Sequence, residues 1–412
     1  MFRALSRRVI APASQSRTYI ALSAGNGDFG RLGHEATTDD FGEQTLRSLQ
    51  TFHPIAALDG IDVRQVAAGG SHSAFLTSCG HVFTCGLNDF GQLGHSANMQ
   101  FACEPKLVEL DAQIVFVATG HHHTVCVDVD GQVWSFGKNT GGQLGTAELN
   151  GFVPSKIEVL AREAQVKHVA CGAVHTIAVC TEGRVFSWGS STDGVLGHGE
   201  SDTWEKGWFY RSAKMESKPR VVRALAEQNI VTIAAGYAHS ACIDSVGDLY
   251  TWGQGRFNQL GLDATCEYQS TPSRVQSLQI VHDVACGGLH TLANTNAGAM
   301  SWGANQHGEL GLGRNEDGKS AVPKPIKLSS QGWTKIAAGW KHSAGIAGGK
   351  LFSWGFGGSV GSHSNEQMSS GGQLGLGNEF DFWEPQYVPI PGEVKDVSLG
   401  FNHSLCLVDT TT

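Results

Sequence analysis

Short runs in which apolar and polar residues alternate, separated by glycine-rich turns, make up most of the chain. Between residues 114 and 160, "IVFVATG" alternates as a strand, "HHHTVCVDVDG" predicts a second strand and a turn, and "QVWSFGKN" predicts a third. A polar loop with "GGQLG" follows. "VPSKIEVL" then predicts an outer strand with Pro154 at its start, where a missing backbone N–H is tolerated. The pattern therefore predicts four short strands in about 50 residues.

Three sequence markers recur in a constant order, with seven copies each. The first is Gly-x-x-His followed by Ser or Thr, with copies 51, 52, 64, 51, 52 and 61 residues apart. The second is a small or aromatic residue before a glycine, at Gly25, Gly86, Gly137, Gly189, Gly253, Gly303 and Gly355. The third is Gly-x-Leu-Gly, with Asn258 in place of the first glycine in one copy; it ends at Gly33, Gly94, Gly145, Gly197, Gly261, Gly311 and Gly375.

A repeat of four short strands is the blade of a β-propeller, so seven copies predict an all-β, seven-bladed β-propeller over residues 20–412. The last Gly-x-x-His unit, "VSLGFNHSLCLVD", stops after two strands, whereas "IALSAGNGDFGRLG" near the start begins at a third strand. We expect "PIAAL" to supply the fourth. The last blade would then be closed by both termini, which removes exposed sheet edges.

Composition agrees with this architecture. Glycine is abundant, at 54 of 412 residues, and charged residues are few, at 16%, which suits many short strands joined by tight turns. No apolar run approaches the ~18 residues that would span a bilayer, so no transmembrane segment is expected. The ten cysteines form no C-x-x-C pair, and several fall in apolar strand patterns (Cys126, Cys180, Cys242 and Cys406). We expect buried, reduced thiols there, with no disulfide framework or zinc site.

The first 19 residues differ from the rest: they contain serines and four arginines, and no acid precedes Asp28. This is the profile of a mitochondrial transit peptide, so we expect residues 1–19 to direct the chain to the mitochondrial matrix; a disordered basic tail is the alternative. Removing the segment takes away four arginines and no acid, which changes the formal charge from −9 to −13. A chain this acidic is a poor candidate for indiscriminate binding to nucleic-acid backbones, and DNA is not an expected partner.

The seven Gly-x-x-His histidines repeat around the whole ring, which catalysis would not require. A glycine supplies the backbone angles of a tight turn, and a histidine followed by a hydroxyl residue can bond to backbone groups of the neighbouring blade. We therefore expect a structural latch made by Gly69, His72, Gly120, His123, Gly172, His175, Gly236, His239, Gly287, His290, Gly339, His342, Gly400 and His403.

Two motifs imitate ligand sites. "GHHHT" at 120–124 places His121 and His122 beside a latch histidine, but adjacent strand residues point to opposite faces, so no metal site is predicted. "GNGDFG" from Gly25 matches the dinucleotide fingerprint but lacks the following helix. We predict no cofactor and no catalytic residue.

Three segments interrupt the repeat, at about residues 34–53, 198–219 and 356–372, and such segments often carry function. The first is expected to hold a short helix and the third to be a polar loop. The second gathers aromatic residues among mixed charges, which is typical of partner-binding hot spots; a hairpin folded over its own blade is the alternative. Its candidate residues are Trp204, Trp208, Phe209 and Tyr210.

The three markers resemble those of the regulator of chromosome condensation family over nearly the whole of residues 20–412, and this resemblance implies a seven-bladed propeller. Some members catalyse nucleotide exchange on a small GTPase by inserting a wedge. "WGSSTDGVLG" from Trp188 resembles that wedge, with Asp193 at its acidic position. The nuclear exchange factors also place acidic residues inside the Gly-x-x-His loops, whereas none of the seven loop pairs here is acidic. This departure argues against exchange on the nuclear GTPase.

Another branch of the family, the plant UV-B photoreceptor, repeats Gly-Trp-Arg-His-Thr in neighbouring blades. Here only the segment from Gly339 to Ser343 approaches that motif, and the corresponding loop pairs of the flanking blades are Gly288 with Leu289 and Phe401 with Asn402. One tryptophan predicts no clustered chromophore. Trp340 and Lys341, which are peculiar to this copy, remain as candidate partner-binding residues.

We therefore predict a mitochondrial propeller of this family that has no chemistry of its own and binds macromolecular partners. Mitochondrial relatives are associated with ribosome assembly and RNA metabolism, and with exchange on an inner-membrane fusion GTPase. The preferred hypothesis is a scaffold for protein or ribonucleoprotein partners in mitochondrial ribosome assembly or RNA processing, with direct RNA contact left open. One alternative is a guanine-nucleotide exchange factor for a mitochondrial GTPase, acting through Asp193 and the wedge at 190–196. Another is a structural subunit of a larger mitochondrial complex.

Overall fold

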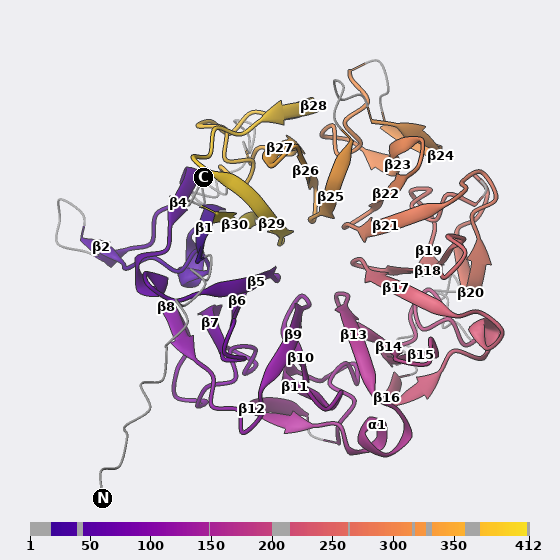
Figure 1. The fold of residues 1–412 in the computed structure, drawn as a ribbon, viewed down its shortest axis with the longest axis horizontal. Coiled ribbons are helices and arrows are strands. Elements are labelled where there is room, and N and C mark those ends of the chain that lie inside the picture. Colours follow the sequence, from indigo (N-terminus) through magenta and orange to yellow (C-terminus); the bar gives the residue numbers. More distant parts are fainter. Residues whose placement is uncertain are drawn as a thin grey trace, which may run out of the picture.

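The computed structural model describes residues 18–38, 44–147, 149–199, 215–262, 264–314, 318–326, 332–358 and 371–409. Within these residues, seven four-stranded antiparallel sheets stand as blades around a central axis (Figure 1). A small two-stranded sheet, β2 (Thr37–Thr38) with β3 (Gln44–Thr45), lies outside the ring. The predicted all-β, seven-bladed β-propeller is confirmed. No helix in the described part of the chain is long and apolar enough to cross a membrane.

The blades are numbered 1 to 7 by their innermost strands, which are β5 (Val63–Ala68), β9 (Ile114–Thr119), β13 (Val166–Cys171), β17 (Ile230–Ala235), β21 (Val281–Cys286), β25 (Trp333–Ala338) and β29 (Glu393–Leu399). The second strands are β6 (His72–Thr77), β10 (His123–Asp128), β14 (His175–Cys180), β18 (His239–Asp244), β22 (His290–Thr295), β26 (His342–Ala347) and β30 (His403–Asp409). The third strands are β7 (Val82–Leu87), β11 (Val133–Lys138), β15 (Val185–Ser190), β19 (Leu249–Gln254), β23 (Gly298–Asn305), β27 (Lys350–Gly355) and β1 (Tyr19–Gly25). The outermost strands are β8 (Phe101–Leu107), β12 (Asn150–Lys156), β16 (Met215–Val221), β20 (Tyr268–Arg274), β24 (Gly318–Pro325), β28 (Phe382–Tyr387) and β4 (Leu49–Pro54). The short helices are η1 (Asp28–Gly30), η2 (Ala56–Leu58), α1 (Glu158–Glu163) and η3 (Arg223–Leu225).

Blade 7 joins the two ends of the chain, as predicted. Strand β1 pairs antiparallel with β30 over its full length, from Tyr19 opposite Asp409 to Gly25 opposite His403. The expected fourth strand, "PIAAL", is wrong. Strand β4 comes from the preceding residues, and Ile55 and Leu58 turn inward to pack in the core between blades 7 and 1. The segment 34–53, which we expected to be an insertion with a helix, thus contains β2, β3 and β4 in its described residues.

The outermost strands protect their free edges with proline. In six blades a proline sits at the point where this strand's register shifts against its neighbour: Pro105, Pro154, Pro219, Pro272, Pro323 and Pro385. A residue without a backbone N–H cannot template another strand, so this placement discourages edge-to-edge association. Pro154 lies near the end of β12 and not at its start as predicted, because Ile157 leaves the sheet and α1 follows.

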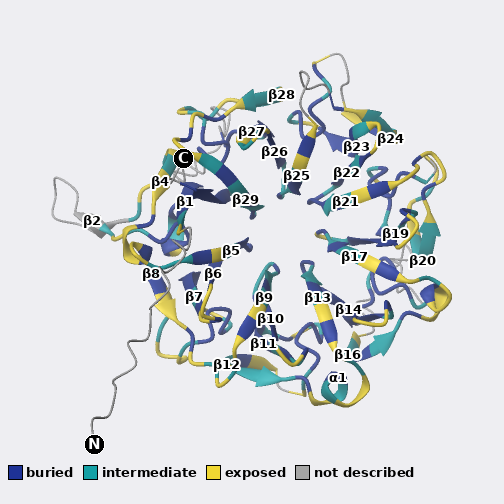
Figure 2. Ribbon diagram, viewed as in Figure 1, coloured by how far each residue is buried: buried dark blue, intermediate teal, exposed yellow. Residues whose placement is uncertain are grey.

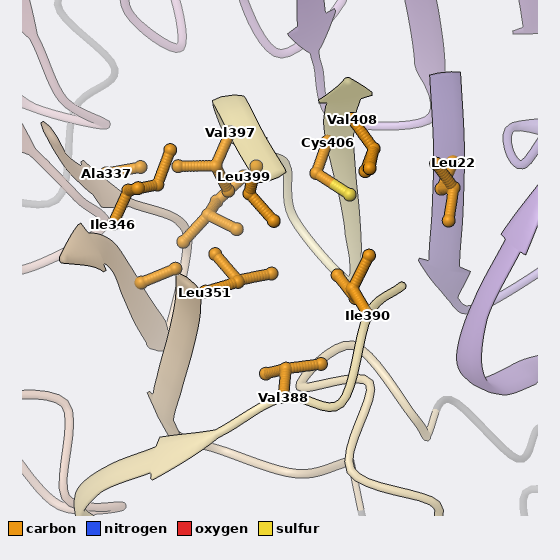
Figure 3. Packing of buried hydrophobic residues seen from close by; sticks show 12 residues of the cluster. Leu22, Ala337, Ile346, Leu351, Val388, Ile390, Val397, Leu399, Cys406 and Val408 are labelled. Atoms are coloured by element: carbon orange, nitrogen blue, oxygen red, sulfur yellow. The ribbon is translucent and has the colours of Figure 1, made fainter. Parts of the chain in front are cut away.

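The apolar core lies between blades. All residues of the second strands in blades 1 to 4 are buried, because each strand is covered by a neighbouring blade on both faces (Figure 2). Val125 and Val127 pack against blade 3, whereas Cys126, between them, packs against blade 1. The cluster in Figure 3 joins blade 6 to blade 7 in the same way. All ten cysteines are free, and the four assigned to apolar strands are buried, as predicted.

Glycine is required at the second marker because two backbone segments of the blade come too close together for a side chain to fit between them. At all seven positions φ lies between 98° and 117°, a region that L side chains rarely adopt. A Cβ atom on Gly137 would lie 2.5 Å from the carbonyl oxygen of His122 and 2.6 Å from the Cα of His123. The marker therefore records a steric requirement of the third strand beside the latch histidine.

The third marker holds a loop onto its own blade. The leucines of this marker are buried. In six blades the leucine carbonyl accepts a hydrogen bond of 2.6–2.8 Å from the hydroxyl of a Ser or Thr nine residues earlier, as Leu93 does from Thr84. In blade 6 the same bond runs from Ser353 to Leu374 across a longer loop. A buried carbonyl is thereby satisfied where the backbone leaves the sheet.

Replacing Gly137 with alanine should lower the free energy of unfolding by about 3 kcal/mol or more, because the substitution combines positive-φ strain with a backbone clash. Gly332→Ala is the matched control, since no atom lies within 4 Å of the added Cβ. Denaturant titration of both variants checks the prediction. Equal stabilities for the two would contradict it.

Candidate functional site

Each second strand begins at a Gly-x-x-His histidine, and its imidazole reaches the next blade around the ring. The Nε2 atom lies 2.9–3.1 Å from the hydroxyl of the Ser or Thr that follows the next blade's histidine. The seven pairs are His72–Thr124, His123–Thr176, His175–Ser240, His239–Thr291, His290–Ser343, His342–Ser404 and His403–Ser73. The last pair joins blade 7 to blade 1 and closes the circle.

Each hydroxyl in turn donates to a backbone carbonyl in the Gly-x-Leu-Gly loop of the preceding blade, at 2.6–3.0 Å. Because its one proton is used there, the hydroxyl must accept from the Nε2–H of histidine, which fixes the tautomer. The expected partner of the histidine was a backbone group. The direct partner is a hydroxyl, and the carbonyl is reached through it. In four blades a buried tryptophan also donates to that carbonyl, as Trp354 does to Glu309 at 2.9 Å.

A second ring of bonds runs through the backbone at the axis. The N–H after the glycine of one loop donates to the glycine carbonyl of the next blade, as from Trp340 to Gly400 (3.1 Å) and from Phe401 to Gly69 (3.1 Å). Six of the seven interfaces follow this pattern, and at the seventh Ala173 donates to the carbonyl of Tyr237. A Cβ on any of the seven glycines would lie 2.5–2.8 Å from the next glycine's carbonyl oxygen, so only glycine fits.

The latch histidines are neutral. Burial lowers the pKa of His72, His123, His239 and His342 to about 3 and that of His175 and His290 to about 4, and holds the pKa of His403 well below its usual value. Desolvation is the main cause in every case, with neighbouring histidines adding to it at most sites. The imidazoles therefore act as neutral hydrogen-bond donors, which is what a structural contact requires.

Four aromatic side chains meet over the mouth of the central channel; we name them the axial cluster. Each occupies the position after the loop glycine, in blades 2, 4, 6 and 7. Trp340 and Phe401 stack with centroids 4.6 Å apart, Phe401 stacks with His121 at 5.4 Å, and Tyr237 closes the group at 4.4 Å from Trp340 and 6.0 Å from His121. Tyr237 is 40% exposed and the others are half-buried, so the cluster faces solvent.

Small residues in the intervening blades make room for these rings. A Cβ on Gly70 would lie 2.2 Å from His121 Cδ2, and a Cβ on Gly288 would lie 2.8 Å from Trp340 Cε3. Blade 3 has Ala173 at the same position. His121 and Trp340 thus each lie beside a glycine of the preceding blade, whereas Phe401 lies beside Trp340. The rings and the glycines line a shallow hollow of about 130 Å³ on the axis.

Cations border the cluster. The Lys138 ammonium lies 4.6 Å from the centroid of Phe90, whose ring lies 5.2 Å from that of His122. Burial and Lys138 lower the pKa of His121, and burial, His121 and Lys138 together lower that of His122 to about 4. The two rings lie 4.1 Å apart, so the expectation that they diverge is wrong: they occupy the loop before β10, where the strand alternation does not apply.

Lys341 is held at the edge of the cluster by its neighbours. Its Nζ lies 3.4 Å from His307 Nε2 and 5.5 Å from the centroid of Phe356. His307 Nδ1 lies 2.9 Å from the Asp381 carboxylate, and the His307 amide donates to Glu309. Burial raises the pKa of Glu309, which stands where most other loops carry glutamine. The acidic groups near Lys341 are thus already engaged with His307.

Asp193, the candidate wedge residue, is buried and lies in a left-handed turn with φ at 53°. Gln254 Nε2 donates to its Oδ2 at 2.9 Å, and Arg256 Nη2 lies 3.7 Å from its Oδ1. The carboxylate therefore joins blade 3 to blade 4. The candidates of the second insertion, Trp204, Trp208, Phe209 and Tyr210, lie outside the described residues.

Of the predicted partner-binding residues, the structure places Trp340 in the axial cluster and Lys341 at its edge. Sequence reasoning missed His121, Tyr237 and Phe401 as members of the same cluster. The signal was available, because all four follow a loop glycine and these positions converge wherever innermost strands surround one axis. The sequence could not show the direction in which each side chain points from its loop.

The fold and the latch define a single seven-bladed β-propeller built from blades that bind one another through histidine and hydroxyl side chains. The chain belongs to the RCC1-like domain family, whose sequence profile matches residues 20–406. It is 33% identical over 354 residues to the ultraviolet-B receptor UVR8 of Arabidopsis thaliana, a match that covers 84% of this chain and 74% of the receptor.

Two further relatives are each 31% identical to the chain. The secretion-regulating guanine nucleotide exchange factor of Bos taurus aligns over 84% of this chain and 75% of its own. The mitochondrial RCC1 domain-containing protein RUG3 of Arabidopsis thaliana aligns over 68% and 73%. Among solved structures, human WBSCR16 superposes with a TM-score of 0.81 at 23% identity, over 96% of this chain and 100% of that one, which supports the fold.

We expect stability to fall as the pH decreases below about 6.5, because the unfolded chain binds protons on histidines that the folded ring keeps neutral until the pH approaches 3 to 4. Each latch histidine contributes a slope of about 1.4 kcal/mol per pH unit inside that window. Asp283 and Glu309, whose pKa values are raised by burial, act in the opposite sense but are only two groups.

Urea unfolding at several pH values from 7 to 4.5 measures this slope. His239→Gln should reduce it by about one proton. Thr291→Val removes the hydroxyl that accepts from His239, so it should lower stability at pH 7 while leaving the slope nearly intact. Identical slopes for His239→Gln and the parent chain would contradict the latch assignment.

Proposed function

We propose that this chain is a non-catalytic mitochondrial scaffold whose axial face binds a protein or ribonucleoprotein partner, in mitochondrial ribosome assembly or RNA processing. The observation that carries the proposal is the axial cluster. It exposes four aromatic rings at the centre of one face, at loop positions that the latch leaves free to vary. Partly exposed aromatic residues grouped around one point are typical of binding hot spots.

The mitochondrial part of the proposal rests on residues 1–19, with their basic, acid-free profile, and on the relative RUG3, whose name places it in mitochondria. Members of the family act as exchange factors or binding scaffolds, and the burial of the ionisable latch groups favours a scaffold. In a stable larger complex, the same face would be a permanent subunit contact.

Guanine-nucleotide exchange is the second candidate, because the secretion-regulating exchange factor is a relative of comparable similarity. The exchange mechanism needs an acidic side chain that reaches the GTPase. Asp193 instead uses its carboxylate within the propeller, and the seven axial loop pairs carry no acid. The scaffold is therefore preferred.

A tagged chain recovered from isolated mitochondria should co-sediment with ribosomal particles on a density gradient. Trp340→Ala combined with Phe401→Ala should reduce this association at least about tenfold, since hot-spot aromatics dominate binding energy. Tyr268→Ala on outer strand β20, where the ring is 43% exposed, is the matched control. Replacing residues 201–213 with a short glycine–serine linker tests the second insertion without cutting into β16.

Purified chain should not accelerate GDP release from mitochondrial GTPases. Accelerated release that is lost in Asp193→Asn would overturn the scaffold proposal and establish exchange. Asparagine keeps the size of the side chain and its hydrogen bond to Gln254, so that a thermal melt can separate a charge effect from misfolding. Unchanged release in the variant would exclude the wedge.

A further inference from the structure

Six aromatic rings form one continuous path across the mouth of the channel. The path begins beside Lys138 in blade 2, crosses the axial cluster, and ends in blades 4 and 6. Successive centroids lie 5.2, 4.1, 5.4, 4.6 and 4.4 Å apart, and the two central contacts are stacked, with planes only 17° and 15° apart. In order, the rings are Phe90, His122, His121, Phe401, Trp340 and Tyr237.

Lysines flank the path in a chain of net charge −9, and the carboxylates of Asp381 and Glu309 near one of them contact His307. Lys138 lies over Phe90 at one end, and Lys341 follows Trp340 near the other. A third cation, Arg31, lies buried behind the path, with Nη1 3.5 Å from the carbonyl of Gly70. Burial, opposed in part by Asp28, lowers its pKa only to about 10, so it stays charged at neutral pH.

The path therefore combines flat, neutral rings with cations at both ends. The parts of the rings that remain exposed offer apolar surface to other planar groups, and ammonium groups on either side suit a ligand whose planar units alternate with negative charge. A basic peptide would be repelled by the three cations. An acidic peptide would match the cations but would bring no planar groups to the exposed rings. Single-stranded nucleic acid supplies both features, since its bases stack on aromatic side chains and its phosphates bind lysine.

We propose that this path binds single-stranded RNA, with bases packed against the exposed parts of the axial cluster and flanking phosphates held by Lys341 and Lys138. The proposal rests on the proposed function and deepens it, because it names RNA as the component that the axial face contacts. Stacking does not distinguish one base from another, so recognition depends little on sequence. The overall negative charge limits contact to this path and keeps RNA off the rest of the surface.

Fluorescence anisotropy of a labelled oligouridylate of about 12 nucleotides, titrated with the whole chain, tests the proposal. Trp340→Ala and Phe401→Ala should each weaken binding about tenfold. Trp340→Phe keeps a stacking ring and should restore most of the affinity. Lys138→Gln and Lys341→Gln should each reduce the slope of log affinity against log salt by about 0.7. Tyr268→Ala should change nothing, and thermal melts confirm that each variant is folded.

Several outcomes would overturn RNA binding at this path. They are the absence of binding to the oligouridylate at physiological salt and equal binding by the Trp340→Ala and Phe401→Ala double variant. Competition by a polyglutamate peptide that is lost in the same variants would assign the surface to a protein. Ribosomal particle capture that requires Trp340 but survives nuclease treatment would overturn RNA binding while supporting the scaffold, so the two proposals fail separately.

Discussion

The hydrogen bond from each latch histidine to the hydroxyl of the next blade is the contact on which the ring depends. A blade of four short strands has an apolar face on each side and cannot bury both alone, so its stability comes from its neighbours. The imidazole is buried beyond the reach of water, and its Nε2–H finds a single acceptor, which in turn needs a loop carbonyl of the first blade. Hydrogen bonds thereby join three residues from two blades, and the same arrangement repeats at every interface until blade 7 bonds to blade 1.

The other recurring residues serve this contact. The glycine three residues before the histidine is required because the carbonyl of the next blade leaves no room for a Cβ. A second glycine, on the third strand, pairs with the histidine and is required because a Cβ there would touch the backbone of the histidine. The residue after the first glycine is different. Only its backbone N–H is needed for the inner ring of bonds, so its side chain is free to differ between blades. The axial cluster arises from this freedom, with His121, Tyr237, Trp340 and Phe401 at four such positions.

The number of blades and the closure of blade 7 could be predicted from the sequence because each marker is imposed by a contact repeated seven times. Strand β4 could not: its side chains are largely exposed, and Phe52 stands beside Gly375 where other blades place a proline, so neither hydrophobicity nor the usual residue identified it. The axial cluster was not predicted because its rings come from blades that are distant in the sequence. Asp193 looked like an accessible acid because nothing local shows that Gln254 and Arg256, some sixty residues later, reach its carboxylate.

The pairing of β1 with β30 also sets the order in which the molecule can be made. The apolar stretch from Ile20 to Ala24 is synthesised before the other six blades, yet its partner, the strand from His403 to Asp409, is synthesised after them. Throughout synthesis this early strand is paired along one edge only, with β4, and the blades behind it form an open arc whose two end faces are exposed. Final assembly is therefore a single late event, and a chain interrupted shortly before residue 403 would leave that strand and both faces available to chaperones and proteases.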